Sequence, residues 1–169
     1  FVTRGEAEQR ILGPTVLPSP RETFATFPDL WFDRELTRNV WASLRRVALG
    51  FGLATLIGVP FGVLGGCFSW FNAFLAPLSI FGRNIPVAAL IPLTFSLFGI
   101  GEEQKIMFIF IACVAFILSD SSRAVMDVDR RYMDTAYTLG AGRRQVILKV
   151  LVPLAMPSIF NSLRLLFGL

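Results

Sequence analysis

Histidine is absent from this sequence of 169 residues, and cysteine occurs only twice. Histidine is the commonest general base and metal ligand at neutral pH, so its absence argues against many hydrolases and many metal sites. Cys67 and Cys113 lie in apolar surroundings, without the paired spacing of a metal site or a redox motif. We therefore interpret both as packing residues and expect neither a metal nor a cofactor.

A nucleotide-binding loop of the form G-x-x-x-x-G-K-[ST] is also missing. Paired carboxylates, or a nucleophile beside a base, are not apparent beyond scattered acids in the polar segments. We predict that the chain is not an enzyme. Any energy from ATP hydrolysis must then come from a separate subunit.

Charged residues are scarce, at 17% of the sequence, whereas 54% of the residues are hydrophobic and the mean hydropathy is +0.62. This composition suits a bilayer better than water. Because each span needs roughly 20 apolar residues, the chain is long enough for about four or five spans. The sequence predicts an all-α, polytopic transmembrane helix bundle. It begins without methionine and ends in an apolar run, so we expect a fragment that lacks flanking spans.

The net charge of +4 and the pI near 9.7 could indicate nucleic-acid binding. However, the basic residues lie beside apolar segments, where positive charge determines membrane topology. A protein that binds nucleic acid needs a clustered basic face. We therefore expect membrane lipid, and not nucleic acid, as the surroundings of this chain.

Prolines interrupt residues 1–35, which we interpret as an extramembrane, periplasmic segment ahead of a membrane core at residues 36–169. A helix should begin near Asp33 with an amphipathic lead-in, and the first clear span runs from Val47 to Gly66. Gly58, Gly62 and Gly66 recur every fourth residue in this span. That spacing predicts close packing against another helix.

The next apolar region, Trp70 to Phe98, is too long for one straight crossing and contains three prolines, so we expect it to be bent or broken. Arg83 and Asn84 lie within it. Polar groups at membrane depth usually face protein or a water-filled path, and both residues are candidates for such a path. Arg83 could instead extend its side chain to the membrane interface. A polar turn at Gly99 to Lys105 precedes a third apolar run, Ile106 to Leu118, which we expect to enter water at Ser119 to Arg123.

The polar segment 119–149 contains more basic residues than the preceding turn, which has only Lys105, and this difference predicts a cytoplasmic location. These residues are Arg123, Arg130, Arg131, Arg143, Arg144 and Lys149. Counting crossings backwards then places Gly99–Lys105 outside, the turn near Ser69 inside and the N-terminal segment outside. Arginines before the first span do not fit this assignment, but long segments have little weight in the rule.

Within this segment, Asp129 is a predicted N-cap, and an apolar face follows at helical spacing. Asp134 lies in the early turns, where a carboxylate suits the helix dipole, and Gly140 or Gly142 can end the helix. The apolar face comprises Met133, Ala136, Tyr137 and Gly140. Lipid headgroups or a partner protein must cover it.

Asp134-Thr135-Ala136, Gly140, Val150, Val152 and Pro153 keep the spacing of the EAA loop, and this segment resembles that loop of ABC importer permeases. The loop reads E-A-A, three residues, G, nine residues, then I-x-L-P. The chain departs from it at Asp134, Thr135 and the two valines. Arg83 to Leu93, Gly99 to Glu102 and Leu139 to Arg144 are similar to the nitrate, sulfonate, taurine and bicarbonate branch, and the likeness runs from about Pro18 to Leu169.

This resemblance implies a type I importer fold, a permease dimer in the bacterial inner membrane, and a periplasmic or lipid-anchored solute-binding protein. It also implies that the loop helix docks on a cytoplasmic ABC ATPase and moves the spans between inward-open and outward-open states. Asp134 would pair with a basic group of the ATPase or cap the helix. The residues implied in coupling are Met133, Asp134, Thr135, Ala136, Tyr137, Gly140 and Pro153.

The last apolar segment contains Asn161 and Arg164, and Arg164 falls roughly 20 Å into the helix at the rise of 1.5 Å per residue. Arg164 could attract an anion in the pathway or bond to carbonyls of neighbouring spans. Two other function classes stay open. One is a membrane assembly or interaction protein without a conduit, and the other is a membrane-embedded enzyme. Within the transport class, a permease of the same fold for a solute that is not an anion also stays open.

Overall fold

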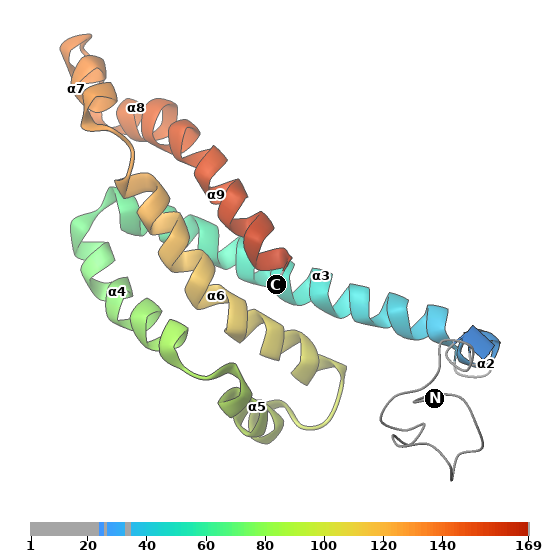
Figure 1. The fold of residues 1–169 in the computed structure, drawn as a ribbon. Helices are drawn as coiled ribbons and strands as arrows, with labels where there is room; N and C mark the ends of the chain where they lie inside the picture. Colours follow the sequence, from blue (N-terminus) through green and yellow to red (C-terminus); the bar gives the residue numbers. More distant parts are fainter. Residues whose placement is uncertain (1–23, 26, 33–34, 169) are drawn as a thin grey trace, which may run out of the picture. The chain divides into compact units, whose positions relative to one another are not determined.

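The computed structural model describes residues 24, 25, 27–32 and 35–168, which form helices and no strand (Figure 1). This confirms the all-α prediction. The chain divides into two units, Phe1–Arg45 and Arg46–Leu169. The helices are α2 Phe27–Phe32, α3 Leu36–Cys67, α4 Ser69–Asn84, α5 Leu90–Phe98, α6 Glu102–Met126, α7 Arg130–Thr138, α8 Arg143–Val146 and α9 Val152–Phe167, with a 3-10 turn at Val87–Ala89 and a π-helical turn at Ile147–Leu151.

The first unit contains α2 and the beginning of α3. Its described residues include an exposed ion pair in which Arg38 Nη1 lies 2.7 Å from Glu35 Oε2. Asp33, where the sequence predicts a helix start, lies outside the described residues, and so does most of the predicted periplasmic segment. The described part of α3 begins at Leu36 and contains the whole predicted first span.

Three helices of the described chain are long and apolar enough to cross a membrane: α3, α6 and the continuous helix Arg143–Phe167. A fourth candidate is the pair formed by α4 and the segment Val87–Phe98, which meet at an angle of 91°. The described residues therefore contain three candidate spans, or four if the bent pair counts as one. This agrees with the predicted polytopic bundle.

The bend between α4 and α5 follows from the proline at position 86. A residue before proline is pushed out of the helical region, and Ile85 is extended, with φ −71° and ψ 126°. The side-chain amide of Asn84 donates to the carbonyl of Ile80, at 2.7 Å, and covers one of the carbonyls left free at the end of α4. Gly99, with φ 70°, ends α5. The prediction of a broken span in Trp70–Phe98 is confirmed.

Helix α6 is longer at both ends than the sequence predicted. It begins at Glu102, inside the predicted turn Gly99–Lys105, because Glu102 and Glu103 suit the positive end of the helix dipole. It continues to Met126, so the predicted exit into water at Ser119–Arg123 is wrong. Ser121 and Ser122 are only 2% and 5% exposed, because their small side chains face neighbouring helices and not solvent.

The glycines of α3 form the contact with α6. A Cβ atom at Gly62 would lie 2.6 Å from the carbonyl oxygen of Leu118, and one at Gly58 would lie 2.8 Å from the Ile117 side chain. At Gly66 a Cβ would lie 2.5 Å from that of Val125. These separations leave no room for a side chain, so the predicted role of the glycine repeat in helix packing is confirmed.

The largest buried cluster lies where α6 meets α9. Its buried members are Ala124, Val125, Leu151, Ala155 and Ile159, and side chains of α3 and Met133 of α7 pack against it. The contacts in this cluster are apolar. In a bilayer such helix contacts are held by close packing, since lipid tails are as apolar as the side chains.

The ends of the bundle agree with the predicted order of crossings. In Figure 1 the α3–α4 junction, α7 and α8 lie at one end, and α5 lies at the other. The guanidinium carbon of Arg143 lies 5.4 Å from the ring centre of Phe68, which joins α8 to that junction. At the opposite end Arg46 forms an ion pair with Glu102, with Nη2 and Oε1 2.8 Å apart. Arg46 therefore has a counter-charge on its own side of the bundle.

Candidate functional site

Helix α7, between two spans, has well-defined ends. Asp129 is its N-cap, since the carboxylate accepts the N–H of Arg131 at 3.0 Å, as the sequence predicted. Gly140 has φ 82°, a left-handed conformation that glycine adopts without strain. Its N–H donates to the carbonyl of Tyr137, and the next N–H, of Ala141, donates to that of Ala136. Gly140 therefore ends the helix, as predicted.

The predicted apolar face of α7 is divided between two environments. Met133 and Ala136 are partly buried, and Met133 packs against the α6–α9 cluster of this same chain. From the sequence we predicted that lipid or a partner would cover Met133, but the cluster of its own chain covers part of it. Three apolar side chains remain exposed: Tyr132 at 56%, Tyr137 at 49% and Leu139, beyond the end of the helix, at 82%. We call Tyr132, Tyr137 and Leu139 the α7 surface.

Two further predicted coupling residues, Asp134 and Thr135, are exposed on α7. The Thr135 hydroxyl donates to the carbonyl of Arg131, one turn earlier, at 2.7 Å. Asp134 makes no side-chain hydrogen bond or ion pair to the described residues. The N-cap is Asp129, so the carboxylate of Asp134 is free to meet an outside group.

A hollow of about 330 Å³ lies beside the α7 surface, between α7 and the helix that follows. Most of its floor is apolar, and Lys149 supplies a positive charge at its wall. Its lining residues are Ala136, Leu139, Gly140, Ala141, Gln145, Lys149 and Val150. The predicted loop residues Ala136 and Gly140 therefore meet in one concave surface.

Pro153 is not part of the α7 surface. It lies in the first turn of α9, just after a short π-helical turn. The N–H of Val152 donates to the carbonyl of Ile147, five residues earlier, which makes the turn Ile147–Leu151 π-helical. Proline has no N–H with which to continue the usual helical pattern. A π turn commonly marks a functional position in a long helix. Here it joins α8, next to the hollow, to α9 in the bundle.

Arg83 is paired with a charge on α6. Its Nη1 lies 2.9 Å from both Asp120 Oδ1 and Ser119 Oγ, and its guanidinium carbon lies 5.0 Å from the ring centre of Phe116. The side chains of Arg83 and Asp120 are 30% and 27% exposed. Arg83 thus contacts protein, as expected of a polar group within an apolar segment. Its place in a solute pathway stays a prediction.

The other pathway candidates differ from Arg83. Asn84 bonds to its own helix, as described above. Asn161 and Arg164 are exposed on α9, and no hydrogen bond or ion pair links either side chain to the described residues. Arg164 lies one turn before Phe167, whose ring meets that of Phe51 at 5.2 Å. Arg164 therefore lies toward the end of the bundle that contains Glu102.

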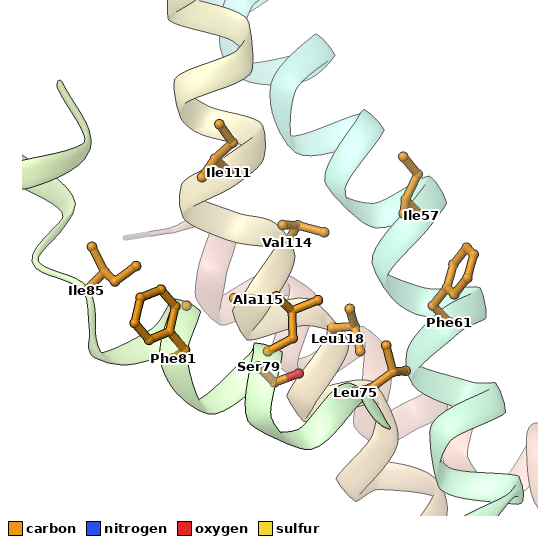
Figure 2. A pocket seen from close by; sticks show the side chains of 12 residues that line it. Ile57, Phe61, Leu75, Ser79, Phe81, Ile85, Ile111, Val114, Ala115 and Leu118 are labelled. Carbon is orange, nitrogen blue, oxygen red and sulfur yellow. The ribbon is translucent and has the colours of Figure 1, made fainter. Parts of the chain in front are cut away.

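A separate cavity of about 440 Å³ opens between α3, α4 and α6. Figure 2 shows Phe61, Leu75, Phe81 and Ile111 among the side chains around it. Apart from Ser79, the lining residues are apolar. Such a lining suits hydrocarbon and would give a polar solute no hydrogen-bond partner.

Residues 58–169, which include α6, α7 and α9, match the model of the family described as "Binding-protein-dependent transport system inner membrane component". This chain belongs to that family of ABC transporter permeases. The matched region covers more than half of the sequence, including the glycine-packed helices, the broken span and the α7 surface.

Relatives with assigned names include a taurine permease and a bicarbonate permease. The chain is 32% identical to the taurine transport system permease protein of Escherichia coli over 167 residues, covering 96% of this chain and 61% of the relative. It is 34% identical to the bicarbonate transport system permease protein of Synechococcus elongatus over 168 residues, covering 93% and 60%. A probable ABC transporter permease of Brucella melitensis is 33% identical over 156 residues, covering 92% and 63%. The chain thus spans about three fifths of the length of these relatives.

Among solved structures, the chain is similar to an inward-facing form of the MetNI methionine ABC transporter, with a TM-score of 0.68. The match covers 83% of this chain and 70% of that chain, at 23% identity. At this identity the likeness shows a shared fold and nothing more.

Sequence reasoning missed some residues of this region. Asp120 was assigned to an exit into water, so its pairing with Arg83 was not foreseen. Leu139 was outside the predicted coupling set, although it is the most exposed part of the α7 surface. The pairing of Asp120 with Arg83 could have been found from the sequence. Each lies in or next to an apolar run, where a charged side chain needs a counter-charge.

Proposed function

We propose that this chain is the transmembrane subunit of an ATP-driven importer for a small anion such as taurine, another sulfonate, bicarbonate or nitrate. ATP hydrolysis takes place in a separate ABC ATPase, and the assembly lies in the bacterial inner membrane. The observation that carries the proposal is the α7 surface, an exposed apolar surface held between two spans with a concave hollow beside it. Names of the relatives support the choice of solute.

The α7 surface suits a protein partner. Leu139 and Tyr137 supply apolar contact area, and the hollow beside them can receive a side chain of the ATPase. The free carboxylate of Asp134 can pair with a basic group of that subunit. Gly140 permits close approach, since no heavy atom lies within 4 Å of the position that a Cβ would occupy there.

Helix α7 is connected closely to the spans on both sides. The short link Asp127–Asp129 joins it to α6, and Gly140–Gly142 joins it to α8. When ATP binding closes the ATPase dimer, a displacement of α7 therefore acts on α6 and α9 together. Rocking of these helices gives alternating access of the solute site to the two sides of the membrane.

The solute pathway, in this proposal, runs beside the exposed face of α9. Arg164 offers an unpaired positive charge, and Asn161, three residues earlier, offers an amide. A charge inside the membrane needs a partner or a polar path. A second permease copy, packed against this face, would enclose both side chains and complete the path. Arg83 and Asn84 contribute less, because both are already bonded within this chain.

The opposite end of the bundle is the proposed docking side for a periplasmic or lipid-anchored solute-binding protein. Ile100, in the turn between α5 and α6, is 94% exposed there. Ile100 also provides a matched control for the α7 surface. Both Ile100 and Leu139 are exposed, apolar and outside the core.

The test is affinity purification of the full-length subunit from native membranes in mild detergent, followed by mass spectrometry. Leu139→Asp should lose the co-purifying ATPase, since it places a charge in the centre of the apolar contact. Ile100→Asp should retain the ATPase. A binding protein that co-purifies with the wild type would identify the solute through its bound ligand.

Two results would favour the other function classes. If wild type and both variants purify without an ATPase, the importer proposal fails and a membrane assembly protein becomes the better interpretation. If the purified subunit alone hydrolyses ATP after its partner has been rigorously removed, the chain is an enzyme in its own right.

A further inference from the structure

The contacts of Arg83 and Asp120 are unlike those between most other spans. Arg83 touches Phe116, Ser119 and Asp120, which lie one above another on one face of α6. Its hydrogen bonds of 2.9 Å to the carboxylate and the hydroxyl fix both the distance and the register of α4 against α6. The two side chains are mostly covered, so water provides only part of their solvation.

The position of Arg83 matters because the broken span ends α4 only one residue later. At the extended residue Ile85 the helical hydrogen bonding is interrupted and the segment bends by 91°, so this position can act as a hinge between α4 and α5. Gly82, next to Arg83, lets α4 lie close to α6, since a Cβ at Gly82 would lie 2.6 Å from that of Ala115. The ion pair therefore holds α4 to α6 immediately before the break.

Two more polar contacts join the same segments on either side of Arg83. Toward the α7 end, the Ser122 hydroxyl donates to Asn72 Oδ1 at 3.2 Å. Beyond the break, the amide of Gln104 donates to the hydroxyl of Thr94 at 2.9 Å, and both residues are buried. Polar bonds thus join α4 and α5 to α6 at three levels.

The contact between α6 and α9 has no such bonds. Between the described residues of these two helices there is no side-chain hydrogen bond or ion pair, and the buried contact is made by apolar side chains. Apolar packing resists separation but does not fix register as directed polar bonds do. Helix α9 can therefore shift along α6 at a lower cost than α4 can.

We propose that Arg83 is a positioning residue: paired with Asp120, it makes α4, α5 and α6 move as one body when α7 is displaced, while α9 moves against that body. This rests on the proposed coupling of α7 to an ATPase. In this arrangement Arg83 does not contact the solute. The ion pair keeps α4 and α5 attached to α6, so that a displacement of α6 also displaces α5 at the opposite end of the bundle.

The test is a charge-exchange series in the full-length subunit, assembled with its ATPase in lipid nanodiscs: Arg83→Glu, Asp120→Arg and the double variant. The readout is Mg-ATP hydrolysis per ATPase-bound complex, so that lost folding alone does not alter it. Each single variant should hydrolyse ATP about tenfold more slowly, and the double variant should return to within about threefold of wild type. Arg123→Glu, on the exposed face of α6, is the matched control and should be unaffected.

Neutral variants keep the test decisive if the reversed charges prevent assembly. Arg83→Gln and Asp120→Asn retain hydrogen-bonding groups, and each should also slow hydrolysis. Wild-type turnover in both neutral variants, or a double exchange no better than the singles, would overturn the inference. A wild-type subunit that binds no ATPase would instead refute the proposed function, so the two failures are distinguishable.

Discussion

The two sides of helix α6 are built in different ways. Toward α4 and α5 it forms directed polar contacts, from Asn72–Ser122 through Arg83–Asp120 to Thr94–Gln104. Toward α3 and α9 it forms close apolar contacts, with glycines on α3 and a buried aliphatic cluster on α9; the polar contact on this side is the Arg46–Glu102 pair at the exposed end of α3 and α6. Both kinds of contact hold helices together in a bilayer, but only the first fixes their register.

This difference suggests a division of labour within one bundle. The polar side keeps a proline-broken span attached to a straight one, and the apolar contact with α9 has no polar bond between the described residues that would fix its register. A transporter needs both properties, since alternating access requires rigid parts that move relative to one another. Four substitutions test the comparison, in order of decreasing expected effect.

The largest effect is expected at Gly62. In Gly62→Val the new side chain would collide with the backbone of Leu118, which cannot move without displacing α6. We expect a loss of about 3 kcal/mol of stability, measured by thermal unfolding in nanodiscs. Gly52→Val on the same helix is the control, because no atom lies within 4 Å of its Cβ position. Equal melting temperatures for the two variants would contradict the glycine-packed contact.

The next effect concerns the α6–α9 cluster. Ile159 is 2% exposed, and Ile159→Ala should cost about 2 kcal/mol, since it removes packing atoms and leaves a cavity. Phe160→Ala, at a neighbouring position that is 62% exposed, should cost much less. Both variants are compared by thermal unfolding. If Phe160→Ala proves the more harmful, α9 contacts the bundle through a different face.

A smaller effect is expected at the buried polar pair of α5 and α6. Gln104→Leu removes the hydrogen bond to Thr94 and should cost about 1 kcal/mol. Adding Thr94→Val should cause little further loss, because no unpaired partner then remains. The double-mutant cycle should therefore show strong coupling. If the stability losses of the two substitutions simply add, the two side chains act independently. Glu103→Leu, on the exposed side of α6, is the control.

The smallest effect is expected at the exposed end of the bundle. Glu102 pairs with Arg46 and Lys105 in contact with solvent, where solvent and salt weaken ion pairs. Glu102→Gln should therefore leave the melting temperature unchanged at low and at high salt. A clear loss of stability that disappears at high salt would show that this pair, like Arg83–Asp120, fixes helix positions.

Sequence periodicity was enough to predict the parts of the fold that depend on local rules. Four such features are the glycine repeat, a break within Trp70–Phe98, the Asp129 cap and a glycine stop at Gly140 or Gly142. Which proline breaks the span was not predicted. The extent of α6 could not be predicted this way. Ser119 to Arg123 read as polar, and only the packing of α3 and α4 around Ser121 and Ser122 makes burial of those side chains favourable.

The candidate site shows the same limit. The loop helix and its glycine were predicted from spacing, but the partial burial of Met133 and the exposure of Leu139 depend on how α7 folds back on the α6–α9 cluster. Arg83 was recognised as unusual in an apolar region. Its partner lies 37 residues away, and periodicity within one segment gives no information on contacts between segments.

The most direct test of the account is ATP-driven uptake into proteoliposomes that contain the full-length subunit, its ATPase and the binding protein loaded with its own ligand. Uptake should need all three components and ATP, and Leu139→Asp should abolish it. ATPase binding, measured separately, should be intact in Ile100→Asp. Uptake that continues without ATP, or ATPase activity that does not depend on contact with the α7 surface, would contradict it.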